Sequence, residues 1–483
     1  MTRTGHWIDD WRPEDPEFWE NGGRQVARRN LIWSIFAEHL GFSVWLIWSV
    51  SAAFLLQMGF DFTPQQLFLL VALPNLVGSL LRLPYTFAVP RFGGRNWTII
   101  SAALLLVPTL LFAIAVRDPG TPYWVFCLIA ATAGFGGGNF ASSMANINFF
   151  YPAAKKGAAL GLNAAGGNAG VAIIQLLLPV IVGGAGIFGI VSASEGGIHL
   201  QTAGFVYAGL AVCAAVAAYL WMDNLTSATS KPREQLAVVR RPHTWIMAFL
   251  YIGTFGSFIG YSAAMPLLIK INFWVPEPAP LGTGIYFAYF AFLGAGIGSV
   301  TRPLGGWLAD RYGGARVTLA AFIGLVVFTL AMLGTLTRLA PNPAADPAIA
   351  SDNQALFPWF LGCFLLIFAA TGIGNGSTYK MIPAIWRREA ETTTEAGTPE
   401  RTAALSAATK QSSAALGIIG AVGALGGFLI PLAFSSPWVD DPLAATKGAF
   451  VVFTSFYVVC GLVTWGVYLR RPAKATALAT AGV

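Results

Sequence analysis

Long apolar segments recur along the whole chain, separated by short polar connections. A membrane-spanning helix needs about 20 consecutive apolar residues, and the segments here have about that length. Only 11% of the 483 residues are charged, against about 25% in an ordinary soluble domain, which argues strongly against a water-soluble enzyme. We count twelve such segments, near residues 31–55, 66–90, 96–116, 123–149, 157–182, 203–222, 244–269, 283–309, 315–337, 357–382, 406–431 and 447–469.

The basic residues are distributed unequally between the two sides of these segments. Of 29 Lys and Arg residues, 22 fall in the tails and in the connections on the same side as the tails, and only four fall on the other side. Because positively charged connections stay in the cytoplasm, this bias predicts that both termini are cytoplasmic. Residues 1–30 have no cleavable apolar core, so we expect a cytosolic tail there and no signal peptide.

Three basic residues remain inside the segments, and two of them repeat in register. Arg82 precedes Arg91 by nine residues and the pair Gly93-Gly94 by eleven, and Arg302 has the same spacing to Arg311 and Gly313-Gly314. A duplicated six-helix unit explains this match. The second copy also contains a loop pattern that resembles the signature of the major facilitator superfamily, formed by Gly306, Asp310, Arg311, Gly313, Gly314 and Arg316.

We therefore expect an all-α membrane protein with twelve transmembrane helices, arranged as two six-helix bundles related by a pseudo-two-fold axis. The expected parts are an N-terminal tail (1–30), a first bundle (31–222), a cytoplasmic linker (223–243), a second bundle (244–469) and a C-terminal tail (470–483).

The paired arginines indicate an anion site. An arginine in hydrocarbon costs about 2.5–3.5 kcal/mol on insertion scales, and its planar fork of donors fits flat oxyanions. Asn75, Gly78, Ser79, Arg82 and Thr86 are spaced by three and four residues, which places them on one helical face. The alternative is that both arginines bridge helices or reach the interface for structural reasons.

Two glycine-rich stretches flank these arginines in sequence. One runs from Gly134 to Asn146 and continues from Gly161 to Gly170, and the other runs from Gly372 to Thr378. Small residues let helices pack closely in lipid, which accounts for the glycines. The excess of Asn and Ser on one face of the first stretch is less easily explained by packing, because polar groups in the middle of a span tend to face a path for water or substrate. These residues are Asn139, Ser142, Ser143 and Asn146.

Here the sequence resembles the nitrate/nitrite porters of the NarK type, within the major facilitator superfamily. The resemblance rests on residues 134–170, on residues 372–381 and on Trp11-Arg12-Pro13-Glu14-Asp15-Pro16. It implies one anion held between Arg82 and Arg302 at the bundle interface. It also implies an aromatic sandwich from Phe140 and Phe255 with Phe42 nearby, hydrogen bonds from Tyr251 and Asn168, and closure by the backbone near Gly417 and Gly420.

Glu38 is the one acidic residue, among 22, that falls inside an apolar segment. Two roles are open: a coupling proton carrier, or a structural or gating pair with Lys380. His39, three residues before Phe42, is either polar packing or part of a relay. Asn139 and Asn375 complete the set of candidate coupling or gating residues.

The resemblance predicts a bacterial inner-membrane transporter that exchanges nitrate for nitrite by alternating access. Proton-coupled nitrate symport through Glu38, or transport of another small anion, are the alternatives. We expect a monomer in a lipid bilayer, with nitrate and nitrite, and protons in the symport alternative, as its partners, and with no cofactor, metal or nucleic acid. The four scattered histidines offer no catalytic or metal-binding pattern, so an enzyme is not expected.

Overall fold

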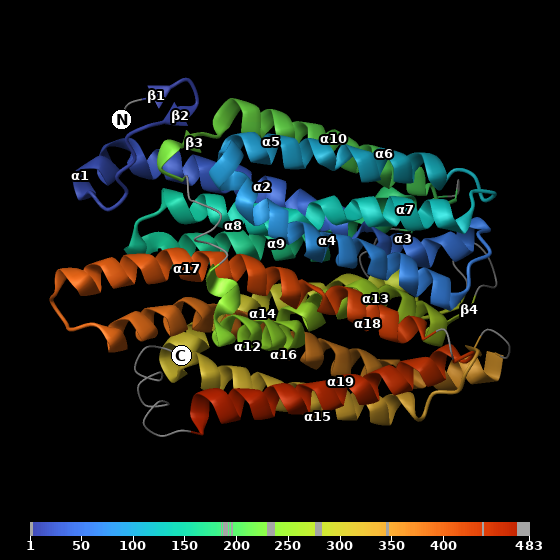
Figure 1. Cartoon of the computed structure of the whole chain (residues 1–483). Helices are drawn as coiled ribbons and strands as arrows, with labels where there is room; N and C mark the ends of the chain where they lie inside the picture. The colour runs from blue at the N-terminus through green and yellow to red at the C-terminus, as the bar shows by residue number, and fades with distance from the viewer. Residues whose placement is uncertain are drawn as a thin grey trace.

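The polypeptide forms a long bundle of roughly parallel and antiparallel helices in a computed structural model (Figure 1). The structure describes residues 3–184, 186, 192, 194, 197–228, 237–275, 283–343, 347–436 and 439–470. Parts of two expected segments, 229–236 of the linker and 471–483 of the C-terminal tail, lie outside the described residues. The first and last described residues, in β1 and at the end of the last helix, lie at the left of Figure 1. We call this side the terminal end and the other side the opposite end.

The N-terminal half supplies six antiparallel spans, several of which are broken into shorter helices. Span by span they are α2 (Arg24–Trp45) with α3 (Ile47–Leu55), α4 (Pro64–Phe92), α5 (Gly94–Leu104) with α6 (Leu106–Ala115), α7 (Tyr123–Ala133) with the 3₁₀ turn η3 (Gly134–Gly138) and α8 (Asn139–Phe150), α9 (Ala153–Ile181), and α10 (Leu200–Trp221). A short 3₁₀ turn, η2 (Leu56–Met58), follows α3.

The C-terminal half repeats this arrangement. Its spans are α12 (Pro242–Tyr251) with the π-helical turn η7 (Ile252–Gly256) and α13 (Ser257–Phe273), α14 (Ala291–Tyr312), α15 (Gly314–Leu336), α16 (Pro347–Thr393), α17 (Pro399–Ala424) with α18 (Gly426–Ser435), and α19 (Pro442–Thr464) with η10 (Trp465–Leu469). Short 3₁₀ turns lie at Thr226–Ala228 (η5), Ala237–Arg240 (η6) and Phe287–Tyr289 (η8). The twelve-span, two-bundle architecture predicted from the sequence is confirmed.

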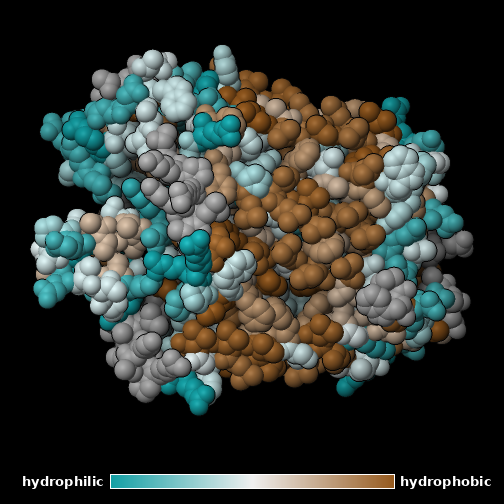
Figure 2. Space-filling view, viewed as in Figure 1, coloured by the Kyte–Doolittle hydropathy of each residue, from teal (hydrophilic) through white to brown (hydrophobic). Residues whose placement is uncertain are grey.

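Eleven helical segments of the described chain are long and apolar enough to cross a bilayer. The predicted eighth span, α14, is a continuous 22-residue helix that does not reach the same hydropathy, because its glycines and Arg302 dilute its apolar residues. Figure 2 shows the consequence of this composition for the whole surface: a broad band of hydrophobic side chains crosses the middle of the molecule, and hydrophilic residues gather at both ends.

Glycine allows three N-terminal helices to touch where the chain passes through η3. A Cβ atom on Gly136 would lie 2.1 Å from the carbonyl oxygen of Gly41, and one on Gly137 would lie 2.8 Å from the Cα atom of Gly78. Both distances are far below ordinary van der Waals contact. The first glycine-rich stretch is thus a packing surface for α2 and α4, as the small-residue pattern predicted.

The N-terminal tail is folded onto the terminal end of the first bundle, although we expected only a polar tail. Strands β1 (Arg3–Thr4), β2 (Trp7–Ile8) and β3 (Asn224–Leu225) form a small sheet, antiparallel between β1 and β2 and parallel between β2 and β3. Helix α1 (Pro16–Phe18) and the π-helical turn η1 (Trp19–Gly23) lead directly into α2. The buried rings of Trp11 and Trp19 explain the folding, because they form a separate hydrophobic cluster with Phe150. At the opposite end, β4 (Trp274–Val275) and β5 (Thr283–Gly284) form a second, two-stranded sheet.

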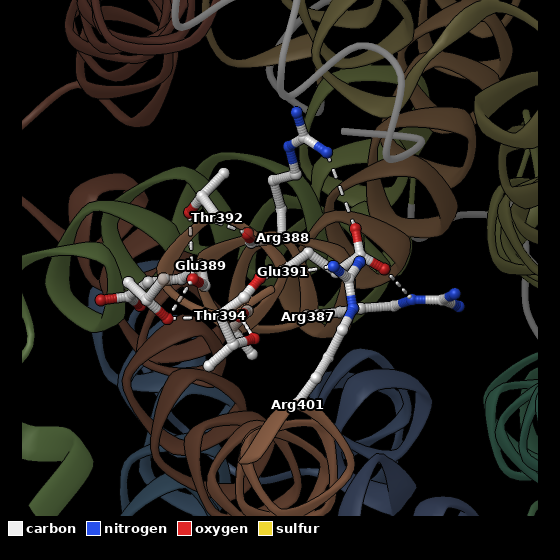
Figure 3. A network of polar contacts seen from close by, with 9 residues as sticks. Arg387, Arg388, Glu389, Glu391, Thr392, Thr394 and Arg401 are labelled. Carbon is white, nitrogen blue, oxygen red and sulfur yellow. Dashed lines mark hydrogen bonds and ion pairs between the residues drawn. The ribbon is translucent and has the colours of Figure 1, made fainter. Parts of the chain in front are cut away.

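The terminal end of the second bundle is held by a polar network between α16 and α17 (Figure 3). Arg387 donates to Glu391 at 2.9 Å, and Arg388 forms an ion pair with the same carboxylate at 3.7 Å. Arg401, in the first turn of α17, donates to the carbonyl oxygen of Thr394 at 3.4 Å. The two ion pairs lie within the last turns of α16, where each contributes little, and the Arg401 hydrogen bond joins the start of α17 to the end of α16.

The two bundles contact each other at the opposite end. Gln175 on α9 donates to the carbonyl oxygen of Ser262 on α13 at 2.7 Å, and Ser435 on α18 donates to the carbonyl oxygen of Gln65 on α4 at 3.0 Å. At the terminal end, Asn148 donates to the hydroxyl of Ser413 at 3.1 Å. The central part of the same interface contains the predicted site.

Candidate functional site

Arg82 lies on α4 in the bundle interface and is fully buried. Its Nε donates to the carbonyl oxygen of Gly137 at 3.0 Å, and its Nη1 donates to the carbonyl oxygen of Gly420 at 3.0 Å. The third nitrogen, Nη2, is buried and has no hydrogen-bond partner. The guanidinium is therefore fixed by one carbonyl from each bundle and retains an unused donor.

Arg302 lies on α14, in the other bundle, and only 5% of its surface is exposed. Both of its terminal nitrogens, Nη1 and Nη2, are buried without a hydrogen-bond partner. Buried polar groups are normally paired, and an unpaired buried charge is costly. Together with Nη2 of Arg82, three guanidinium nitrogens are thus buried without an acceptor in the described part of the chain.

Aromatic rings form the walls around these cations. The Cζ atom of Arg82 lies 4.9 Å from the ring centroid of Phe140 and 4.8 Å from that of Phe255. These two rings are nearly parallel, with centroids 6.2 Å apart and planes inclined by 24°. The Cζ atom of Arg302 lies 5.7 Å from the Phe140 ring. Arginine is favoured over aromatic faces, so the rings hold both cations without neutralising them.

The remaining predicted pocket residues are placed as follows. Tyr251 stacks on Phe255 at 5.3 Å, and its hydroxyl is buried without a partner. Phe42 packs edge-on against Phe140 at 6.1 Å. Asn168 on α9 is fully buried, and neither atom of its amide has a partner. Tyr251 and Asn168 are therefore buried polar groups that have no partner among the described residues.

The two glycines of α17 have different contacts. The carbonyl oxygen of Gly420 accepts from Arg82, as described above, and a Cβ atom there would lie 3.7 Å from Nη1 of Arg82. A Cβ atom on Gly417 would lie 2.6 Å from the hydroxyl oxygen of Thr86. Gly420 thus contributes a backbone acceptor, and Gly417 permits the close approach of α17 to α4.

Glu38 is buried on α2 beside the site. Its Oε2 accepts a 2.7 Å hydrogen bond from the amide of Asn163, while Oε1 has no hydrogen-bond partner. The same Asn163 amide also contacts the hydroxyl of Ser143 at 2.6 Å. The carboxylate attracts both Arg82 and Arg302 through space. Glu38 is therefore part of the electrostatics of the pocket.

Lys380 does not pair with Glu38, and that alternative is corrected by the structure. Its ammonium contacts both carboxylate oxygens of Asp310, at 2.6 and 2.5 Å, and the two side chains are 43% and 60% exposed. The physical reason is that Lys380 lies on a partly exposed surface of α16, where Asp310 in the last turn of α14 is available. Glu38 instead stays inside the first bundle.

The other candidate gating residues remain without an assigned role. His39 has its Nδ1 atom 3.1 Å from the carbonyl oxygen of Gly166 on α9, which is a packing contact between two helices. Asn139 and Asn375 are 3% and 1% exposed, and neither amide has a partner. They lie on the two glycine-rich stretches, one in each bundle.

Two residues of the site were not predicted. Tyr379 lies with its ring 6.5 Å from that of Phe140 and 5.4 Å from Cζ of Arg302, and Asn163 holds Glu38. Both fall within or directly after the glycine-rich stretches, which was the available signal. Among the described residues, no group of three His, Cys, Asp or Glu side chains could hold a metal ion.

Comparison with known proteins identifies the family of the chain. Residues 39–396 match the family described as Major Facilitator Superfamily. The chain is 41% identical to the Nitrate/nitrite transporter NarU of Escherichia coli (strain K12) over 96% of both chains. It is 35% identical to the Probable nitrate/nitrite antiporter NarK2 of Thermus thermophilus, over 97% of this chain and 98% of the relative.

Solved structures show the same fold at low sequence identity. The inward open conformation of the xylose transporter XylE from E. coli superposes with a TM-score of 0.56 at 14% identity, covering 90% of this chain and 94% of that chain. A bacterial homolog of the human lysosomal transporter Spinster, in an inward-facing and unoccupied conformation, gives 0.59 at 13% identity, covering 94% and 98%. The chain belongs to the major facilitator superfamily, in the nitrate/nitrite porter family of the NarK type, and is a transporter rather than an enzyme.

Proposed function

We propose that this protein exchanges nitrate for nitrite across the membrane by alternating access, with the anion bound between Arg82 and Arg302. The observation that carries the proposal is the set of three buried guanidinium nitrogens without an acceptor, contributed by both bundles. A small flat oxyanion has several acceptor oxygens in one plane, which suits the planar fork of arginine.

Charge balance favours a monovalent anion. Arg82 and Arg302 contribute two positive charges, and Glu38 contributes one negative charge when it is ionised, so that the empty pocket then carries a net charge of +1. One nitrate or nitrite ion brings the pocket to neutrality. A phosphate dianion would exceed this balance, and an empty pocket would leave a cation uncompensated in a poorly hydrated interface.

The same balance favours exchange. Rocking of the two bundles about a central site must carry the pocket through a state closed to water on both sides. Closing over an uncompensated charge is costly, while closing over a bound anion is not. The protein should therefore change its orientation readily only when loaded, so that entry of one anion requires the exit of another.

Proton-coupled nitrate symport is the second candidate, and one observation favours it. Oε1 of Glu38 is buried without a hydrogen-bond partner, so this carboxyl group could accept a proton. Protonation of Glu38 in the loaded state and ionisation in the empty state would change the charge balance above. A proton gradient would then drive nitrate uptake without internal nitrite.

Nitrate/nitrite counterflow in proteoliposomes, with and without a pH gradient, distinguishes the two. Exchange requires internal nitrite and is indifferent to the gradient, while symport responds to the gradient alone. Arg82→Ala should abolish either activity. Competition by formate or phosphate tests transport of another small anion, which would contradict the charge balance if phosphate competed as well as nitrite.

We further propose that the protein works as a monomer in the bacterial inner membrane, with both termini in the cytoplasm. The hydrophobic band of Figure 2 supports a bilayer position for the helices. The concentration of Lys and Arg in the tails and connections of the terminal end supports the orientation. Accordingly, the opposite end faces outward.

A further inference from the structure

Lys270 is a buried cation that the mechanism above does not use. It lies in the last turn of α13, at the opposite end of the molecule, and only 2% of its surface is exposed. In the described part of the chain, no carboxylate lies within ion-pair distance of its ammonium. Buried lysines are almost always paired, so the residue requires an explanation.

The ammonium is held by the other bundle. It donates to the carbonyl oxygen of Ala53 on α3, and it lies 4.2 Å from the ring centroid of Trp274 and 5.5 Å from that of Phe287. Ala53 is among the last four residues of α3, whose carbonyls lack partners within the helix and form the negative end of its dipole. The C-terminus of α3 therefore compensates the charge in this conformation.

This compensation cannot persist when the bundles separate at the opposite end. Lys270 belongs to the C-terminal bundle and Ala53 to the N-terminal one, so opening pulls the ammonium away from its acceptor. The neighbouring contact between the rings of Phe54 and Phe287, with centroids 5.0 Å apart, joins the same two bundles and must also open. Without the Ala53 carbonyl, the three N–H donors of the ammonium become available to a ligand.

We infer that Lys270 is a second, outer anion site, which binds a small monovalent oxyanion when the opposite end is open. It lies on the same continuous helical segment as Tyr251 and Phe255, and 15 residues separate it from Phe255, or about 22 Å at 1.5 Å per residue. An anion held there is thus about four helical turns from Phe255, and it would move along α13 towards the central arginines. The inference rests on the proposed function for the identity of the anion and for the outward orientation.

The helix terminus and the anion would serve as alternative partners of one cation. With the opposite end closed, the C-terminus of α3 compensates Lys270, and with it open, nitrate or nitrite does. An anion that arrives from outside and binds Lys270 therefore stabilises the conformation that is open at the opposite end. Steering of this kind affects entry from one side only.

The test is counterflow in proteoliposomes containing protein of uniform orientation, with half-saturation measured separately for outer nitrate and for inner nitrite. Lys270→Gln keeps a donor for the Ala53 carbonyl and removes the charge, Lys270→Arg keeps the charge, and Lys270→Met removes both. Lys447→Gln is the matched control, since Lys447 is a half-buried lysine near the start of α19 in the same bundle.

For Lys270→Gln we expect about a tenfold higher half-saturation for outer nitrate, the loss that removal of one charged hydrogen-bond donor produces, with the inner value within twofold of wild type. Lys270→Arg and Lys447→Gln should resemble wild type, and Lys270→Met should show at least the defect of Lys270→Gln. If Lys270→Gln does not fold, the same asymmetry in Lys270→Met supports the inference.

Two results would overturn it. If the half-saturation values for outer nitrate and inner nitrite changed equally, Lys270 would contribute only to the stability of the protein. If the outer value stayed unchanged in both uncharged variants, Lys270 would only contact α3 and would not bind an anion. Failure of the proposed function is seen separately, because wild-type protein in the same liposomes would then show no nitrate/nitrite counterflow at all.

Discussion

Arg82 and Arg302 come from different bundles, yet the Cζ atoms of both lie over the ring of Phe140, at 4.9 and 5.7 Å. One aromatic ring thus serves as a common wall for two like charges that repel each other. Its negative face offsets part of this repulsion, but neither guanidinium gains a carboxylate partner from it. The arrangement brings the two cations together and leaves their outer nitrogens for a ligand.

Replacement of Arg302 by lysine should abolish exchange even though it conserves the charge. Lysine lacks the planar fork, and both terminal nitrogens of Arg302 are unpaired in the protein, so two hydrogen bonds to the anion would be lost or misplaced. At about 1.5–3 kcal/mol for each hydrogen bond to a charged group, counterflow should fall at least about 100-fold. Arg316→Lys, on the exposed start of α15, is the control. Exchange by Arg302→Lys within threefold of wild type would contradict a bidentate role.

The Tyr251 hydroxyl should contribute to affinity and little to folding. It is buried on α12 without a partner, so Tyr251→Phe removes no hydrogen bond from the empty protein while the ring still stacks on Phe255. We expect the half-saturation for nitrate to rise about tenfold, as one hydrogen bond to a charged ligand predicts. Tyr207→Phe, on the buried face of α10, is the control and should leave the half-saturation for nitrate unchanged. Equal half-saturation in Tyr251→Phe and wild type would remove the hydroxyl from the site.

The register of the two arginines was the most informative feature of the sequence, because a duplicated charge in an apolar segment has few structural explanations. The fold follows from the same pattern of apolar segments, and it is confirmed. The aromatic walls were less accessible from sequence. Phe140 and Phe255 were placed by family resemblance, since aromatic residues on a helical face more often belong to a core.

The polar partners of Glu38 and Lys380 could not be derived in that way. Both residues were assigned to the same halves of their spans, which made a pair plausible, but the direction of each side chain depends on how the helices rotate. The structure turns Glu38 towards Asn163 on α9 and Lys380 towards Asp310 on α14. A helical repeat fixes which residues share a face, and it leaves open which neighbouring helix that face meets.

Lys380→Met should therefore affect exchange only slightly. The ion pair with Asp310 is solvated at both partners, and exposed pairs are worth about 0–1 kcal/mol. We expect counterflow within about fivefold of wild type, because 1 kcal/mol corresponds to roughly a fivefold change. Asp310→Asn should give a defect of similar size, and the double variant should be no worse than either. A complete loss of counterflow in Lys380→Met, but not in Asp310→Asn, would indicate that Lys380 takes part directly in transport.

Glu38→Gln separates the two transport mechanisms. Glutamine keeps the size of the side chain and an acceptor oxygen for Asn163, but it cannot release a proton. Under the exchange proposal, counterflow with internal nitrite should be slowed but still present, because Gln removes one negative charge from the pocket while both arginines remain to bind the anion. Under symport, uptake driven by a pH gradient should be present in wild type and absent from Glu38→Gln. Loss of counterflow in Glu38→Gln, in protein that is folded by its thermal unfolding profile, would overturn the exchange proposal.

Gly417→Ala should slow exchange by keeping α17 away from α4. The added Cβ atom would lie 2.6 Å from the Thr86 hydroxyl oxygen, so the helices must separate, at a cost of about 1–3 kcal/mol typical of overpacking. The same separation lengthens the hydrogen bond from Arg82 to the Gly420 carbonyl, one turn along α17. We expect at least about a tenfold lower counterflow rate, with partial recovery in the double variant Gly417→Ala/Thr86→Ala, which removes the clashing atoms. Gly448→Ala has nothing within 4 Å of its new Cβ atom and should exchange normally. A Gly417→Ala protein as fast as wild type would show that this close approach is not required during transport.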